Sequence, residues 1–176
     1  MGYDMYCRGD HPEYAEAGDR FMRTTGNTPE AREALATLER IEREGAYFRL
    51  NVWGMGKARE MMDRFGMLHW ADHPPWPSND HLTNDDWENE TPAYLAYDEA
   101  CNEVRGFVAE MPGIAGVKFG SNDFWWVRPG EIEDALRIYD TLPELERRDA
   151  RGAAEWWDSW VEWLRHVGAH GGAEIR

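Results

Sequence analysis

Three prolines, each placed directly after a residue suited to precede a helix, constrain the fold more than any other feature of the sequence. They lie in the pairs Thr28-Pro29, Thr91-Pro92 and Arg128-Pro129. Proline has no backbone N–H and a φ fixed near the helical value, so it suits the first position of a helix and not the interior of a helix or strand. The threonines can also cap the first turn. Because apolar residues three or four apart follow each pair, we predict that helices begin at these three points.

Short segments rich in aromatic and β-branched residues separate the helices. They predict strands over residues 2–7, 46–53, 114–119 and 124–127, with the last two joined as a hairpin by a turn of four residues. Residues 173–176 are expected to add an edge strand. Because the strands are few and unevenly interleaved with helices, we predict one α+β domain over residues 1–176. It would hold a small, mostly antiparallel sheet packed against four or five helices.

Two further helices are expected from glycine and tryptophan patterns. One would cover residues 57–66, directly after a glycine turn, and the last would cover residues 150–167. Tryptophans at helical spacing in the last helix are expected in the core: Trp156, Trp157 and Trp160. Trp163 and Trp126 are expected to face outward, where they would offer exposed aromatic surface to a partner.

The chain is strongly acidic, and the acids are unevenly distributed. It has 34 Asp and Glu against 19 Lys and Arg, which gives a formal net charge of −15. Nucleic acids and anionic membranes bind cationic surfaces, so neither is an expected partner. No Lys or Arg lies between Arg64 and Arg105, and the same stretch holds nine acids and three tryptophans.

Residues 69–91, within this acidic stretch, are predicted to form a long irregular loop, because prolines, Asn and Asp favour turns. Acids steer the approach of a basic partner, and tryptophans supply contact area. We therefore expect a non-enzymatic interaction protein, an inhibitor or immunity-type factor, whose loop binds a basic protein. The candidate contact residues are Trp76, Asp80, Asp85, Asp86, Trp87, Glu88 and Glu90. The alternative is a solvated loop whose tryptophans pack back onto the domain.

The same loop contains histidines and aspartates that can bind metals. His69 and His73 are four residues apart, as on one face of a helix, but Pro74 limits any helix there to a single turn. The full candidate set is His69, Asp72, His73, Asp80 and His81. A divalent metal bound by this set would make the protein a metal-dependent hydrolase or nuclease-like enzyme. Apart from that alternative, no cofactor is expected.

A second alternative concerns the glycines between the strand at 46–53 and the following helix. Gly54 and Gly56 could present backbone N–H groups to a small phosphorylated ligand, and Lys57 would add a positive charge. The segment lacks the spacing of a Walker loop and the third glycine of a dinucleotide fingerprint. A tight turn between strand and helix explains the same residues.

Other signals for chemistry or targeting are absent from the sequence. It contains no G-x-S-x-G nucleophile elbow and no C-x-x-C pair. Cys7 and Cys101 are expected to be free thiols in a reducing compartment. The first residues do not pair a basic segment with an apolar run, and no apolar run is long enough to span a bilayer. The expected location is the cytoplasm.

Three segments together resemble a group of known proteins. They are Tyr3-Asp4-Met5-Tyr6, YFRLNVWGMG at 47–56 and KFGSNDFWWVRPGEI at 118–132, and a closing W-x-x-W-x-x-x-L-R pattern and a His-Gly-Gly follow them. With these features the chain is similar to small acidic, tryptophan-rich proteins of actinobacteria and actinobacteriophages. The resemblance covers most of the chain and implies no activity and no site residues. In size, acidity and tryptophan content the chain also resembles immunity proteins and phage counter-defence inhibitors.

Overall fold

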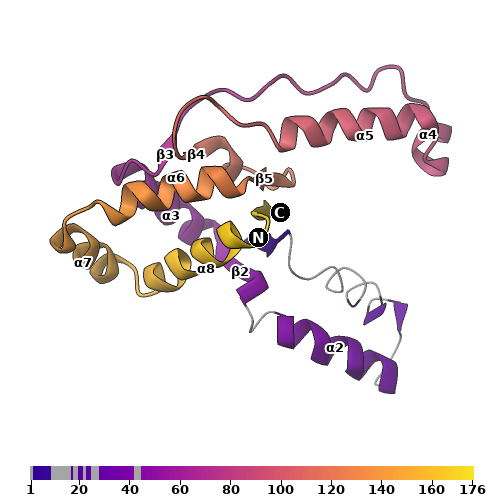
Figure 1. Ribbon diagram of the computed structural model, residues 1–176. Coiled ribbons are helices and arrows are strands. Elements are labelled where there is room, and N and C mark those ends of the chain that lie inside the picture. Colours follow the sequence, from indigo (N-terminus) through magenta and orange to yellow (C-terminus); the bar gives the residue numbers. More distant parts are fainter. Residues whose placement is uncertain (1, 9–16, 18–19, 22, 25–27, 42–44) are drawn as a thin grey trace.

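The main sheet has four strands in the order β2-β1-β6-β5, and every neighbouring pair is antiparallel. The strands are β1 (Gly2–Cys7), β2 (Tyr47–Asn51), β5 (Trp125–Val127) and β6 (Ala173–Ile175). This is a computed structural model, and it describes residues 2–8, 17, 20–21, 23–24, 28–41 and 45–176 (Figure 1). The predicted α+β fold with a small antiparallel sheet is confirmed.

The C-terminal strand β6 lies inside the sheet, whereas the sequence predicted an edge strand. Ile175 is opposite Met5 of β1 on one side and Trp125 of β5 on the other. Ala173 and Ile175 are buried. The sequence pattern could not distinguish the two positions, because a three-residue strand carries no signal for the number of its neighbours.

The predicted hairpin over 114–127 is wrong. Its first part forms β4 (Ile114–Ala115), which pairs in parallel with β3 (Leu68–His69), and a 3-10 helix, η2 (Gly116–Phe119), separates β4 from β5. Gly113 makes the parallel pairing possible. Its φ is +97°, and a Cβ at this position would lie 2.6 Å from the carbonyl oxygen of Met67. Only glycine fits this backbone conformation and this close approach.

Seven α-helices lie within the described residues. They are α2 (Pro29–Ile41), α3 (Val52–Arg64), α4 (Asn84–Asn89), α5 (Pro92–Arg105), α6 (Pro129–Asp140), α7 (Glu144–Ala153) and α8 (Trp157–Ala169). The three proline-marked helix starts are confirmed. Helix α3 begins at Val52 and not at residue 57, because the side chain of Asn51 caps it by accepting a hydrogen bond from the Gly54 N–H at 2.7 Å. Gly54 and Gly56 are therefore helical and do not form a turn.

The predicted last helix over 150–167 consists of two helices. Helix α7 ends at Ala153, the backbone of Ala154 is extended, and α8 begins at Trp157. The sequence of α7, ELERRDARGA, is amphipathic but mostly charged, so a search for apolar residues three or four apart does not identify it as a separate helix.

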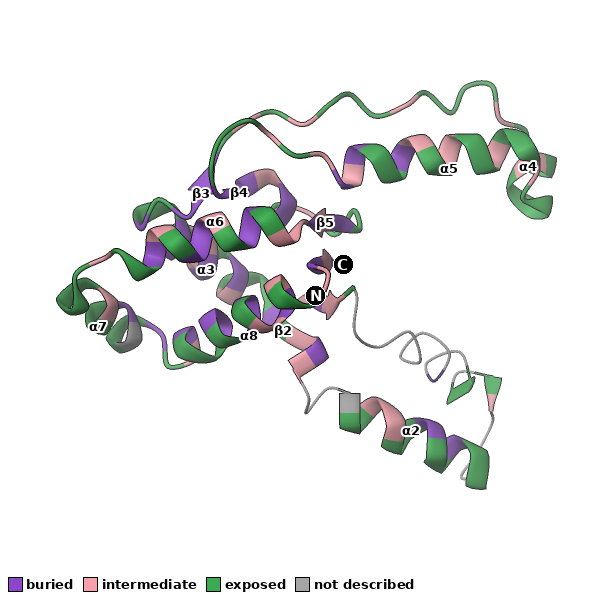
Figure 2. Ribbon diagram, in the orientation of Figure 1, coloured by how far each residue is buried: buried purple, intermediate pink, exposed green. Residues whose placement is uncertain are grey.

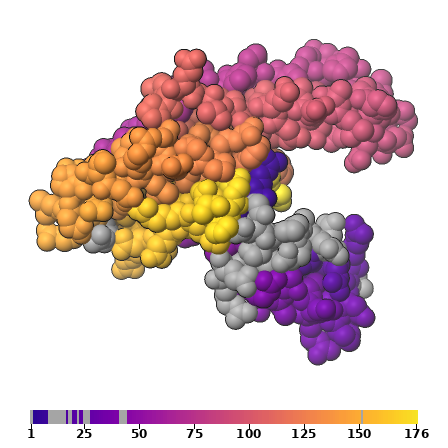
Figure 3. Space-filling view, in the orientation of Figure 1, coloured from indigo at the N-terminus to yellow at the C-terminus, as the bar shows by residue number. Residues whose placement is uncertain are grey.

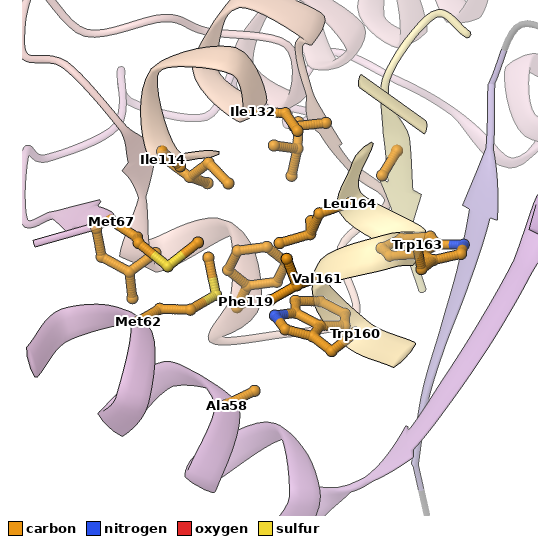
Figure 4. Close-up of a cluster of buried hydrophobic side chains, with 14 of the residues drawn as sticks. Ala58, Met62, Met67, Ile114, Phe119, Ile132, Trp160, Val161, Trp163 and Leu164 are labelled. Atoms are coloured by element: carbon orange, nitrogen blue, oxygen red, sulfur yellow. The ribbon is translucent and has the colours of Figure 1, made fainter. Parts of the chain in front are cut away.

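The core is formed by the four-stranded sheet together with α3, α6, α8, η2 and the β3–β4 pair, and Figure 4 shows part of it. Its largest fully buried side chains include Trp125, Trp157, Trp160 and Phe119. The outward position predicted for Trp163 is wrong. Its indole is buried and stacks on Trp160, with ring centroids 5.3 Å apart.

Half-buried Trp126 lies between two arginines. The guanidinium carbons of Arg8 and Arg128 lie 4.4 Å and 3.5 Å from the Trp126 ring centroid. Trp126 is therefore not the freely exposed aromatic side chain that the sequence suggested.

A buried ammonium group joins three elements on one side of the core. Lys118 of η2 is 0% exposed, and its Nζ donates to Glu131 Oε2 of α6 at 2.6 Å. It also donates to the carbonyl oxygens of Phe107 and Trp126 at 2.7 and 2.8 Å. Burial lowers the pKa of Lys118, and the charge of Glu131 opposes that shift. The three acceptors satisfy every N–H of the ammonium group.

The two lysines of the chain provide a matched test of this contact. Lys118→Met should lower the free energy of unfolding by about 3–5 kcal/mol, because it leaves the Glu131 carboxylate buried without its partner. Lys57→Met should change it by less than about 0.5 kcal/mol, since Lys57 forms only a partly exposed pair with Glu60. Urea unfolding followed by circular dichroism measures both. Equal effects of the two substitutions would contradict the role assigned to Lys118.

Candidate functional site

An extended arm projects from the body of the protein and contains most of the acidic stretch. We define the arm as residues 70–106. The chain leaves the body after β3, runs outward as an irregular segment to α4, and returns along α5 (Figures 1 and 3). Most residues of the arm are exposed (Figure 2). Helix α4 buries no side chain, and α5 buries only Cys101 and Val104.

The predicted loop over 69–91 is only partly irregular. Residues 70–83 have no regular structure, but residue 69 belongs to β3 and residues 84–89 form α4. A capping box explains the helix. Thr83 accepts a hydrogen bond from the Asp86 N–H, and Asp86 Oδ2 accepts one from the Thr83 N–H at 2.8 Å. The capping box places a rigid turn at the tip of the arm.

Asp86 is the residue around which the tip is organised. Its carboxylate accepts hydrogen bonds from the hydroxyl and backbone N–H of Thr83 and from the hydroxyl of Thr91. These hydrogen bonds lower the pKa of Asp86 to about 2. Asp86, predicted as a contact for a partner, thus stays ionised, and its oxygens are occupied by contacts within the arm.

The other predicted acids of the arm lie on its surface, although Asp80 and Asp85 also accept hydrogen bonds from Ser78 and Asn89. The remaining four, Asp80, Asp85, Glu88 and Glu90, are all exposed. Over its whole length the arm contains nine Asp and Glu residues and a single Lys or Arg, which is Arg105. Arg105 lies at the inner end of the arm and pairs with Asp98 at 3.3 Å. The field at the tip is therefore strongly negative.

The three tryptophans of the arm have different surroundings. Trp87 at the tip is 45% exposed and packs on Tyr94 and Tyr97, with ring centroids 5.1 and 5.7 Å away. Trp76 packs back onto Trp125 of β5 at 5.3 Å. Trp70, at the root, donates from its indole N–H to Asp63 of α3 at 2.7 Å. Trp87 therefore lies on α4 at the tip, whereas Trp76 and Trp70 pack against the body.

The candidate metal ligands are not brought together. His69 is buried in β3, where its Nδ1 accepts from the Ala71 N–H at 3.3 Å, whereas His81 is exposed beside the arm tip. His73 packs on Trp125, with ring centroids 5.4 Å apart. Among the residues that the structure describes, no group of three or more His, Cys, Asp or Glu is placed to hold a metal ion.

His69 has an unusual setting for a histidine. Burial lowers its pKa, although the nearby charge of Glu131 opposes the shift. Its Nε2 is buried and has no hydrogen-bond partner. Because Nδ1 accepts a hydrogen bond, the neutral ring carries its proton on Nε2.

The predicted phosphate-binding residues lie at the start of α3. The N–H of Gly54 already donates to Asn51, and Lys57 Nζ contacts Glu60 at 3.1 Å. The Gly54 N–H and the Lys57 ammonium therefore have partners within the chain, and Gly56 lies inside the helix.

Sequence reasoning missed two basic residues near the root of the arm. Lys118 fixes the backbone where the arm returns, and Arg59 of α3 lines a cavity beside Trp70. No motif with a known chemical role contains either residue. For Lys118 the sequence offered one signal, the rarity of lysine, which the chain uses at just two positions, and for Arg59 it offered none.

Two other sequence predictions concern thiols and membranes. Cys7 and Cys101 are free thiols; Cys101 is buried, and the Cys7 thiol donates to the His170 carbonyl at 3.3 Å. In the part of the chain that the structure describes, no helix combines the length and apolar character needed to cross a membrane.

In comparisons with known proteins, no family, curated protein or solved structure matches the chain.

The hydrogen bonds of Asp86 predict how the arm responds to acid. Its folded pKa of about 2 lies below the unfolded value of about 4. The stabilisation of the tip is therefore complete above pH 4 and is lost as the pH falls through 2. NMR titration of the Asp86 carboxyl carbon should give a midpoint near 2, and Thr91→Val should raise it. A midpoint near 4 in the unaltered protein would show that these hydrogen bonds do not form.

Proposed function

We propose that the protein is a non-enzymatic binding protein whose acidic arm docks onto a basic surface of another protein. The observation that carries the proposal is the separation of charge in space. Nine acids lie on an arm that has one arginine, and that arm projects from the domain. Charges presented in this way raise the rate of encounter with a cationic partner and disfavour anionic partners.

The construction of the arm supports this role. Lys118 fixes the root to the body through the Phe107 carbonyl, and within the tip the capping box of Thr83 and Asp86 fixes the start of α4. The acids on α4 are thereby held in a fixed arrangement before binding, which lowers the entropic cost of association. Trp87 adds a partly exposed aromatic surface among these acids. Arginine side chains on a partner can stack on such a ring while they pair with the neighbouring carboxylates.

An inhibitor or immunity-type factor is the kind of protein that fits this arrangement best. Enzymes that act on nucleic acids present clusters of Lys and Arg to phosphates. An acidic arm competes with the nucleic acid for the same Lys and Arg side chains of the enzyme. The expected partner is therefore a basic protein with a cationic groove.

Neutralising the arm should weaken binding to a cationic probe. The arm variant carries Asp85→Asn, Glu88→Gln and Glu90→Gln. The control variant carries Glu146→Gln, Glu155→Gln and Glu162→Gln, three exposed acids of the body. Both variants change the net charge equally. In fluorescence anisotropy with a labelled polyarginine peptide at low salt, the arm variant should bind about tenfold more weakly and the control less than about twofold. High salt should remove the difference. Equal losses in the two variants would exclude the arm as the docking surface.

A second test separates the aromatic contribution from charge. Trp87→Ala should weaken binding of the same peptide roughly two- to fivefold, because an arginine loses its stacking surface. The matched control is Trp53→Ala, since Trp53 is 87% exposed on the body at the start of α3. The control should bind as the unaltered protein does. If Trp53→Ala weakens binding as much as Trp87→Ala, the aromatic contact is not specific to the arm.

A further inference from the structure

A cavity of about 420 Å³ lies at the root of the arm. Its walls come from α3, from the first residues of the arm and from η2 with the turn after it, and they include Arg59, Trp70, Asp72, His73, Val117 and Ser121. This volume lies within the range of small-molecule sites in proteins. The cavity is distinct from the acidic tip, where we propose that a protein partner docks.

Arg59 is the unusual member of this cavity. Although the chain has 34 acids, the Arg59 guanidinium forms no hydrogen bond or ion pair with another described residue. Its Nε is buried and has no hydrogen-bond partner. The guanidinium carbon instead lies 5.4 Å from the ring centroid of Trp70. A buried donor without an acceptor is costly unless a ligand or water satisfies it.

The hydrogen-bonding side chains of Trp70, Ser121 and His73 around the cavity already have partners. The Trp70 indole N–H donates to Asp63 at 2.7 Å, and Ser121 Oγ accepts from the Trp125 indole N–H at 2.9 Å. His73 Nδ1 lies 2.6 Å from the carbonyl oxygen of Pro74. Arg59 therefore provides the unsatisfied polar contact, and the side chains of Trp70 and Val117 provide apolar surface.

The indole of Trp70, which forms one wall of the cavity, packs closely against η2. A Cβ at Gly116 would lie 2.9 Å from the benzo ring of Trp70. Glycine at this position thus allows the indole to lie directly against η2. Together with the Asp63 hydrogen bond, this contact fixes the indole that faces Arg59.

We propose that this cavity binds a small organic anion, with its carboxylate or phosphate on the Arg59 guanidinium and its apolar body against Trp70 and Val117. The planar fork of arginine matches both kinds of anionic group. Asp72, exposed at the rim, repels the anion and limits its affinity.

The test uses four probes and two arginines of α3. Benzoate and phenyl phosphate should bind with roughly millimolar affinity and shift the NMR signals of the Trp70 indole N–H and the Ser121 amide. Acetate and inorganic phosphate, which lack the apolar body, should bind more weakly. Arg59→Gln should weaken binding about tenfold. Arg64→Gln, at an exposed position of the same helix outside the cavity, should leave binding unchanged.

A variant that gains affinity separates the loss of a contact from misfolding, because a misfolded protein does not bind more tightly. Asp72→Asn should strengthen the binding of benzoate about two- to threefold by removing a repelling charge. The better of the two aromatic probes identifies the ligand as a carboxylate or a phosphate ester. The proposal is overturned if neither aromatic probe shifts these signals, if Arg59→Gln binds as tightly as the unaltered protein, or if acetate and phosphate bind as tightly as their aromatic counterparts.

Discussion

The buried ammonium of Lys118 is the constraint on which the rest of the structure depends. A charged group without access to water must find its full set of hydrogen-bond acceptors within the protein. Lys118 finds them in the carbonyls of Phe107 and Trp126 and in the carboxylate of Glu131. These acceptors lie after α5, in β5 and at the start of α6, so one side chain holds together the end of the arm, the sheet and the helix that covers the core. Glu131 also accepts from the Arg128 N–H at 2.9 Å and thereby caps α6.

The arm is a consequence of this fixed root, because it has almost no core of its own. With only Cys101 and Val104 buried on α5, hydrophobic burial cannot hold the arm in place. The arm is held at its two ends, where backbone groups form hydrogen bonds with a buried ammonium group or with an ionised carboxylate.

Two kinds of recognition lie at opposite ends of the same arm. The tip presents carboxylates and Trp87, which suit a cationic protein surface. The root presents Arg59 beside Trp70, which suits a small anion. Because residues of the arm itself line the root cavity, a ligand there would contact both the arm and helix α3. The two proposals rest on different residues, and their tests are independent.

The sequence by itself determined the features that depend on neighbouring residues: the helix starts at Pro29, Pro92 and Pro129, the first two strands, and the acidic composition of the arm. Capping and proline geometry act within a few residues, and charge is a sum over composition, so both can be identified without knowing the fold. Tertiary structure alone decided which strands pair, that β6 lies inside the sheet and that the mostly charged segment of α7 forms a helix separate from α8. It also decided that Lys118 is buried while Lys57 is not, and that Arg59 has no carboxylate partner among the described residues. The reason is that pairing, burial and isolation depend on residues distant in the chain, whose approach is set by the packing of the whole core.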